Sequence, residues 1–138
     1  NVNAVDNNKN TALMYAAMEG RNDIADSLLK SKANAKAINK FGFTALMYAS
    51  IEGHKDVVEL LIPVSDLEVK DRKGYSALIH AIMNKRADVV GLLIDKGAKT
   101  STEDIWGHDA LKHAMNIKQG KVRDSIIDLI VGVEGEKV

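Results

Sequence analysis

Hydrophobic residues along this chain fall into short runs that recur about every 33 residues. The run Ala-Leu-Met-Tyr-Ala follows Thr11 and Thr44, and related runs follow Ser76 and Asp109, at spacings of 33, 32 and 33 residues. A second apolar run follows in each unit, and the apolar positions have helical rather than alternating spacing. We therefore expect two short helices per unit. A fixed period of this size is typical of stacked repeat proteins, whose units bury their apolar faces against each other.

The ends of the first helix in each unit carry recognisable signals. A residue that can cap a helix by accepting a backbone N–H bond precedes each first run: Thr11, Thr44, Ser76 and Asp109. Gly20 and Gly53 suit the left-handed conformation that closes a helix, whereas Lys85 and Lys118 stand at that place in the later units, and Lys32 replaces a glycine at the end of the first unit. A non-glycine residue there costs on the order of 1 kcal/mol, so we expect the third and fourth units to be less well closed.

Each unit also carries an Asp or Asn three residues before a glycine position. These acidic or amide residues are Asp6, Asn39, Asp71 and Asp104, and the glycine position holds Lys9, Gly42, Gly74 and Gly107. Later come Gly53-His54-Lys55-Asp56-Val57-Val58 and Lys96-Gly97-Ala98. Together these residues resemble the ankyrin repeat, whose pattern runs roughly D-x-x-G-x-T-P-L-H-x-A-A-x-x-G-H before a second apolar helix ending in G-A.

The resemblance covers about the whole chain. It implies an all-α ankyrin-repeat solenoid of about four stacked helix-turn-helix units with projecting loop tips, at residues 6–38, 39–70, 71–103 and 104–133. The final helix is expected from Asp124 to Val131, and the polar segment from Val133 to Val138 is expected to fray. The chain starts in what looks like the end of a preceding unit, so we expect a fragment of a longer array.

Where this chain departs from the general family pattern, it is similar to one subset of ankyrin arrays. Alanine replaces the family proline in every unit, and the histidine after it is replaced by Met14, Met47, Ile79 and Lys112. The Ala-Leu-Met form is similar to ankyrin arrays abundant in some protozoa, which can accompany a protein kinase domain. The resemblance thus leaves open a targeting or regulatory arm of a multidomain enzyme.

Composition excludes several classes of function. The 19 basic and 19 acidic side chains cancel, which argues against nucleic acid, because phosphate binding needs an excess of Lys and Arg. The chain has no cysteine, which fits a reducing compartment and excludes thiolate metal sites. It contains no apolar run of about 18 residues, so we expect no membrane span and a cytoplasmic location.

The candidate site lies at the loop tips. In the family, loop tips and first helices form a concave face that binds partner proteins, and aromatic residues most often carry interface energy. Carried over, the expected partner-binding residues are Phe41, Phe43, Tyr75, Trp106, Lys40, Arg72, Lys73, Ile51, Glu52 and Met83. The competing interpretation is that these rings fold back and pack against the next unit. Packing is favoured for Tyr15 and Tyr48, which share a position inside the first helix that His80 and His113 fill in the later units.

No catalytic constellation stands out. Gly120-Lys121 lacks the rest of a phosphate loop, and no nucleophile elbow occurs. Glu103, Asp104 and Asp109 lie near His108 in the sequence, but His108 and His113 are five residues apart rather than the four that align ligands on one helical face. We therefore expect no metal, no cofactor and no enzymatic activity in this chain.

The sequence thus predicts a monomeric protein–protein interaction module. Two alternatives remain open: the regulatory arm of an enzyme such as a protein kinase, and a structural spacer or homodimerisation element. Repeat surfaces vary while the scaffold persists, so the sequence does not name the partner.

Overall fold

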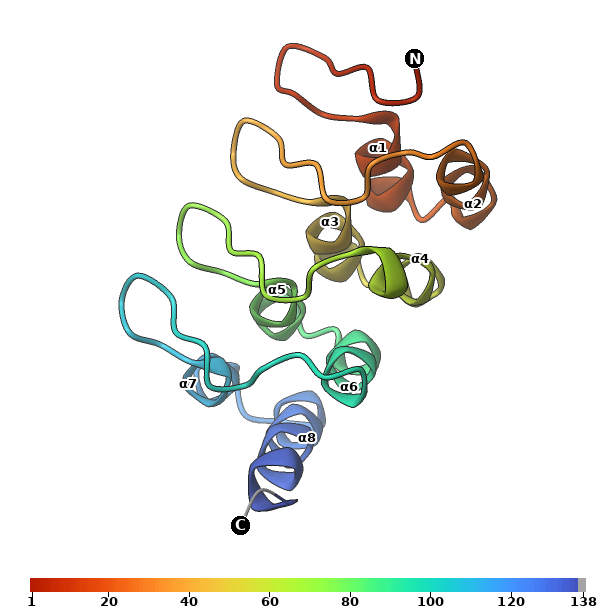
Figure 1. Ribbon diagram of the computed structural model, residues 1–138. Coiled ribbons are helices and arrows are strands. Elements are labelled where there is room, and N and C mark those ends of the chain that lie inside the picture. Colours follow the sequence, from red (N-terminus) through yellow and green to blue (C-terminus); the bar gives the residue numbers. More distant parts are fainter. Residues whose placement is uncertain (137–138) are drawn as a thin grey trace.

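The computed structural model describes residues 1–136 and stacks its helices in pairs along one axis (Figure 1). The pairs are α1 (Ala12–Glu19) with α2 (Asn22–Lys30), α3 (Ala45–Glu52) with α4 (Lys55–Leu61), α5 (Ala77–Met83) with α6 (Ala87–Asp95), and α7 (Ala110–Met115) with α8 (Lys121–Glu136); a short 3₁₀ helix, η1 (Ile62–Val64), follows α4. The expected all-α solenoid is confirmed. Within residues 1–136, no helix is long and apolar enough to cross a membrane.

The helices form two layers, and long loops project beside one of them. The first helices α1, α3, α5 and α7 pack in succession, and the second helices α2, α4, α6 and α8 form the other layer (Figure 1). The loops that precede the first helices all point to the same side of the stack, and the N-terminal segment and α8 lie at opposite ends of it. This arrangement aligns the loop tips in a row beside the first helices.

The core is aliphatic and rich in alanine, as the low aromatic content requires. The alanines at one repeated position, Ala16, Ala49, Ala81 and Ala114, are at most 4% exposed. They lie in the first helices, where their small side chains let neighbouring units approach closely. Leu13, Leu46 and Leu78 fill the space between the layers at about 1% exposure each.

The expected helix caps are confirmed. The hydroxyl of Thr11 accepts a hydrogen bond from the Met14 N–H at 3.1 Å, and Thr44, Ser76 and Asp109 cap their helices in the same way. Gly20 and Gly53 close α1 and α3 with φ of +69° and +73°. These caps satisfy backbone groups that would otherwise lack partners at the helix ends.

Two of the three lysines that replace a glycine after a helix adopt the left-handed conformation expected there, and one does not. Lys32 and Lys85 have φ of +68° and +60°, as expected for residues that replace glycine. The expectation for Lys118 is wrong, because α7 ends at Met115 and Asn116 caps it in the right-handed region. The shorter helix leaves the turn before α8 without a left-handed lysine.

The last helix is longer than the sequence pattern indicated. It was expected over 124–131, but α8 runs from Lys121 to Glu136, so the start of the segment expected to fray is helical. Ile126 and Ile130 are one turn apart and fully buried, and they anchor α8 against the stack. The rest of that expectation falls on residues 137–138, outside the described residues.

Candidate functional site

Each loop tip is organised around one Asp or Asn side chain. In the third repeat, Oδ1 of Asp71 accepts hydrogen bonds from the N–H groups of Lys73 at 2.9 Å and Tyr75 at 3.0 Å. Asp6, Asn39 and Asp104 accept the same two bonds in their repeats. The tip is therefore a closed turn with a defined shape.

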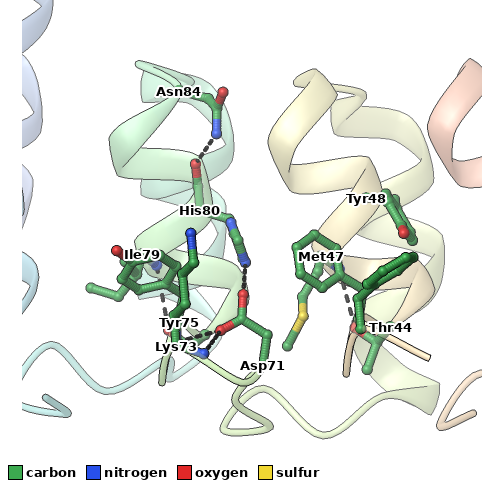
Figure 2. A network of polar contacts seen from close by, with 12 residues as sticks. Thr44, Met47, Tyr48, Asp71, Lys73, Tyr75, Ile79, His80 and Asn84 are labelled. Carbon is green, nitrogen blue, oxygen red and sulfur yellow. Dashed lines mark hydrogen bonds and ion pairs between the residues drawn. The ribbon is translucent and has the colours of Figure 1, made fainter. Parts of the chain in front are cut away.

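The other polar atom of the same side chain reaches a ring on the following helix. Oδ2 of Asp71 lies 2.7 Å from Nε2 of His80, and the two side chains face each other between the loop and α5 (Figure 2). The three equivalent pairs are Asp6 with Tyr15, Asn39 with Tyr48 at 2.7 Å, and Asp104 with His113 at 2.7 Å. The sequence predicted packing for the two tyrosines and did not reveal the pairing in any of the four repeats. The constant nine-residue spacing in every repeat was the signal.

Burial determines the charge state of His80. The side chain is about 5% exposed, and its desolvation lowers the pKa of His80 below the ordinary value, although the nearby Asp71 carboxylate opposes this shift. A neutral imidazole bonded to a carboxylate must donate its proton, so the hydrogen on the ring is on Nε2. His80 thus ties the tip to α5 as a donor.

The rings of neighbouring repeats interleave. The ring of Phe43 lies 5.2 Å from that of Tyr48 and 5.0 Å from that of His80, measured between centroids. The ring of Tyr75 lies 5.5 Å from that of His80 and 5.6 Å from that of His113. Phe43 and Tyr75 are therefore half-buried, and each bridges its own repeat to the next. For these two residues the packing interpretation holds alongside any binding role.

An open hollow lies between the second and third loop tips. It measures about 480 Å³ and is walled by Phe41, Phe43, Tyr75, His80 and Met83, with Asp71, Arg72 and Lys73 beside them. Phe41 is half exposed at its mouth. We call this the loop-tip hollow. A concave, mostly apolar site with a few polar groups is the usual form of a binding pocket.

The structure brings together six of the ten residues expected to bind a partner. These six line the loop-tip hollow: Phe41, Phe43, Arg72, Lys73, Tyr75 and Met83. The other four, Lys40, Ile51, Glu52 and Trp106, do not line it. The Ile51 carbonyl accepts a hydrogen bond from Arg86, and the ring of Trp106 lies 6.1 Å from that of Tyr75, one repeat further on.

Backbone contacts hold successive tips in register. The Lys40 N–H donates to the carbonyl of Asn8 at 2.9 Å, and the Ile105 N–H donates to the carbonyl of Lys73 at 3.1 Å. A Cβ at Gly74 would come within 2.8 Å of the Asp104 Cα. The tips therefore pack directly on each other, and the row of tips is a continuous surface.

One group of side chains has the composition of a metal site. The ligand atoms of Asp104, His108 and His113 lie within 4.8 Å of one another. His108 is not on a helix but in the tip, and the turn brings it close to His113 on α7, with ring centroids 5.7 Å apart. The argument from helical spacing therefore did not apply to this pair. Asp109, also named as a neighbour, instead caps α7.

A family model described as ankyrin repeats, in three copies, matches residues 1–71 and again residues 28–104. The search of curated proteins found no matching relative. The helix pair α7 and α8 lies beyond the matched residues but continues the same stack.

Proposed function

This chain belongs to the ankyrin repeat family, and on that premise we propose that it binds a partner protein through the loop-tip hollow and the tips around it. Repeats of this family are generally protein–protein interaction modules and are typically non-catalytic. The proposal assigns this general role to one part of the surface.

The observation that carries the proposal is the exposure of apolar side chains around a concave site. Phe41 and Trp106 are 50% and 56% exposed at the second and fourth tips, and the half-buried Phe43 and Tyr75 line the hollow next to Phe41. Large aromatic side chains that are left half in water gain most from being covered by a partner. The hydrogen bonds within each tip hold these rings in place before binding, which reduces the entropy lost on association.

The charges around the hollow indicate the chemistry of the partner. Arg72 and Lys73 flank the apolar walls, and Lys40 is exposed in the adjacent tip. None of these side chains forms an ion pair with another described residue. The Asp71 carboxylate is already bonded to His80. We therefore propose that the partner presents an apolar anchor next to carboxylate groups, whose negative charge complements the three basic side chains around the hollow.

For the oligomeric state, the repeat boundaries and the location of the protein, the proposal keeps the expectations from the sequence. We propose a monomeric, non-enzymatic module of about four repeats, with boundaries near 38–39, 70–71 and 103–104. A cytoplasmic location agrees with the lack of cysteine. The alternative is a homodimer in which two copies of the chain bury the same exposed rings against each other. Light scattering over a range of protein concentrations distinguishes a monomer from such a dimer.

The test uses peptides selected from a random display library on the immobilised chain. Their affinity is then measured for the wild type, for Phe41→Ser and for Val64→Ser. Val64 is a matched control, since it is 43% exposed but lies on η1, away from the loop tips. We expect Phe41→Ser to weaken binding at least about tenfold, as a hot-spot residue does, and Val64→Ser to leave it unchanged. Equal affinity for all three proteins would overturn the proposal.

A further inference from the structure

The tip of the fourth repeat differs from the other three in the side chains that meet there. Oδ2 of Asp104 lies 2.7 Å from Nε2 of His113 and 4.0 Å from Nδ1 of His108. We propose that Asp104, His108 and His113 together bind a divalent zinc-class ion. Two imidazoles and one carboxylate are ligands that Zn²⁺ accepts in tetrahedral sites, and imidazole also suits Co²⁺, Ni²⁺ and Cu²⁺.

His108 supplies the third potential ligand beside the Asp104–His113 pair. The position after the tip glycine holds Asn10, Phe43 and Tyr75 in the first three repeats and histidine only in the fourth. The third repeat has the same Asp–His pair, with Asp71 and His80 also 2.7 Å apart, but Tyr75 in place of the second imidazole. The Asp–His pair therefore has a structural role in both repeats. The fold does not require the second imidazole, that of His108, because the third repeat has a tyrosine there.

The carboxylate is already oriented as a ligand. Oδ1 of Asp104 accepts hydrogen bonds from the N–H groups of Trp106 at 2.8 Å and His108 at 3.0 Å, which leaves Oδ2 directed at the two rings. Such outer bonds fix the geometry of a metal ligand.

Binding requires only small movements. Zinc bonds of 2.0–2.1 Å place neighbouring tetrahedral donors about 3.3 Å apart. The Asp104–His113 pair must open slightly, and the His108 ring must move toward them. The His108 side chain is 40% exposed, so its ring has room to move, whereas Asp104 and His113 are nearly buried. When the metal binds Nε2 of His113, the ring keeps one proton on Nδ1 and so coordinates as a neutral imidazole. Three protein ligands leave a fourth position for water or a partner's side chain.

The test is calorimetric titration of the untagged chain with ZnCl₂, alongside His108→Tyr. This variant gives the fourth repeat the side chain of the third, so it is expected to fold, and equal melting temperatures without metal check this. We expect one ion per wild-type chain and at least a roughly tenfold loss of affinity in the variant, because even loss of an outer-shell partner typically costs 10–100-fold. The fluorescence of Trp106, the only tryptophan and two residues from both Asp104 and His108, should change on titration in the wild type alone.

Two results would overturn the inference. One is a wild-type chain that takes up no Zn²⁺ in the calorimeter. The other is a folded His108→Tyr variant that binds Zn²⁺ as tightly as the wild type, which would place the ion elsewhere, for example at His54. A His54→Gln variant is the control for that position. We expect it to keep the wild-type affinity, since His54 bonds to the Met18 carbonyl, away from this tip.

Discussion

Nε2 of His80 lies 2.7 Å from Oδ2 of Asp71, nine residues earlier in the chain, and both side chains are buried (Figure 2). The bond joins the loop tip to the first helix of the same repeat. Since Oδ1 of Asp71 also closes the turn through the N–H groups of Lys73 and Tyr75, a single carboxylate sets the tip's shape and its position relative to α5. The walls of the loop-tip hollow are thereby held before a partner arrives.

The first prediction concerns the His80–Asp71 bond. We expect His80→Ala to destabilise the chain by about 1–3 kcal/mol, because it leaves the buried carboxylate without its side-chain partner. His80→Tyr should cost less than about 1 kcal/mol, since a tyrosine hydroxyl can donate to Asp71 as Tyr15 does to Asp6. Urea unfolding of both variants measures the difference. Equal losses would contradict the claim that a side chain donating to Asp71 stabilises this repeat.

The second prediction is a pH dependence of stability. Burial lowers the pKa of His80, with Lys73 acting in the same direction and Asp71 opposing it. The unfolded chain therefore binds a proton more readily than the folded one. The resulting stabilisation is complete above the unfolded pKa of about 6.5 and is lost as the pH falls from there through the folded pKa.

The measurement is the free energy of unfolding from pH 7.5 down to 5. We expect the wild type to lose stability below about pH 6.5, with a slope of at most about 1.4 kcal/mol per pH unit from this residue. His80→Tyr removes the titrating group, so its slope should be smaller. Parallel pH profiles for the two proteins would mean that His80 is not buried in its neutral form.

The third prediction compares two equivalent glycines. Gly74 and Gly107 have nearly the same φ, +81° and +79°, so alanine is strained at both. At Gly74 the new Cβ would also come within 2.8 Å of the Asp104 backbone, whereas at Gly107 the nearest atom is 3.8 Å away. Gly107→Ala should cost about 1 kcal/mol and Gly74→Ala clearly more. Equal losses, measured by urea unfolding, would contradict the direct packing of the tips.

The fourth prediction tests the strained lysine at the end of α5. Lys85 has φ of +60°, so Lys85→Gly should stabilise the chain by about 0.5–1 kcal/mol once the greater freedom of glycine in the unfolded state is subtracted. Lys96→Gly is the matched control. Lys96 caps α6 with φ of −90°, so glycine there should destabilise by about 0.5–1 kcal/mol. Thermal melts of both variants should shift in opposite directions.

The sequence predicted the scaffold well, because its signals are local. The cap at Thr44 and the left-handed Gly53 act within a few residues, and their effect is the same in any helix. The last helix was predicted less well: α8 runs from Lys121 to Glu136, whereas the expected range 124–131 covers only its middle, which includes the buried Ile126 and Ile130. Sequence signals identify a helix more firmly than they fix its ends.

The site was predicted only in part. Residue types placed Phe41 and Arg72 in an expected binding surface, but whether a ring faces solvent or the next repeat depends on neighbours 37 or 38 residues away in the sequence. Phe43 of the second repeat contacts His80 of the third, and Tyr75 of the third repeat contacts His113 of the fourth. No helical or strand period relates these positions. The approach of His108 to His113 was missed for a different reason, because a turn rather than a helix brings the two rings together.

The most direct test of the central claim is to map where a selected peptide binds by amide chemical shifts in a ¹⁵N-labelled chain. We expect the largest changes at the residues of the loop-tip hollow, from Phe41 to Phe43, from Arg72 to Tyr75, and at Met83. Amides of α2, α4 and α6 should change little. Changes confined to those outer helices would contradict the claim that this protein binds its partner through the tips and the hollow.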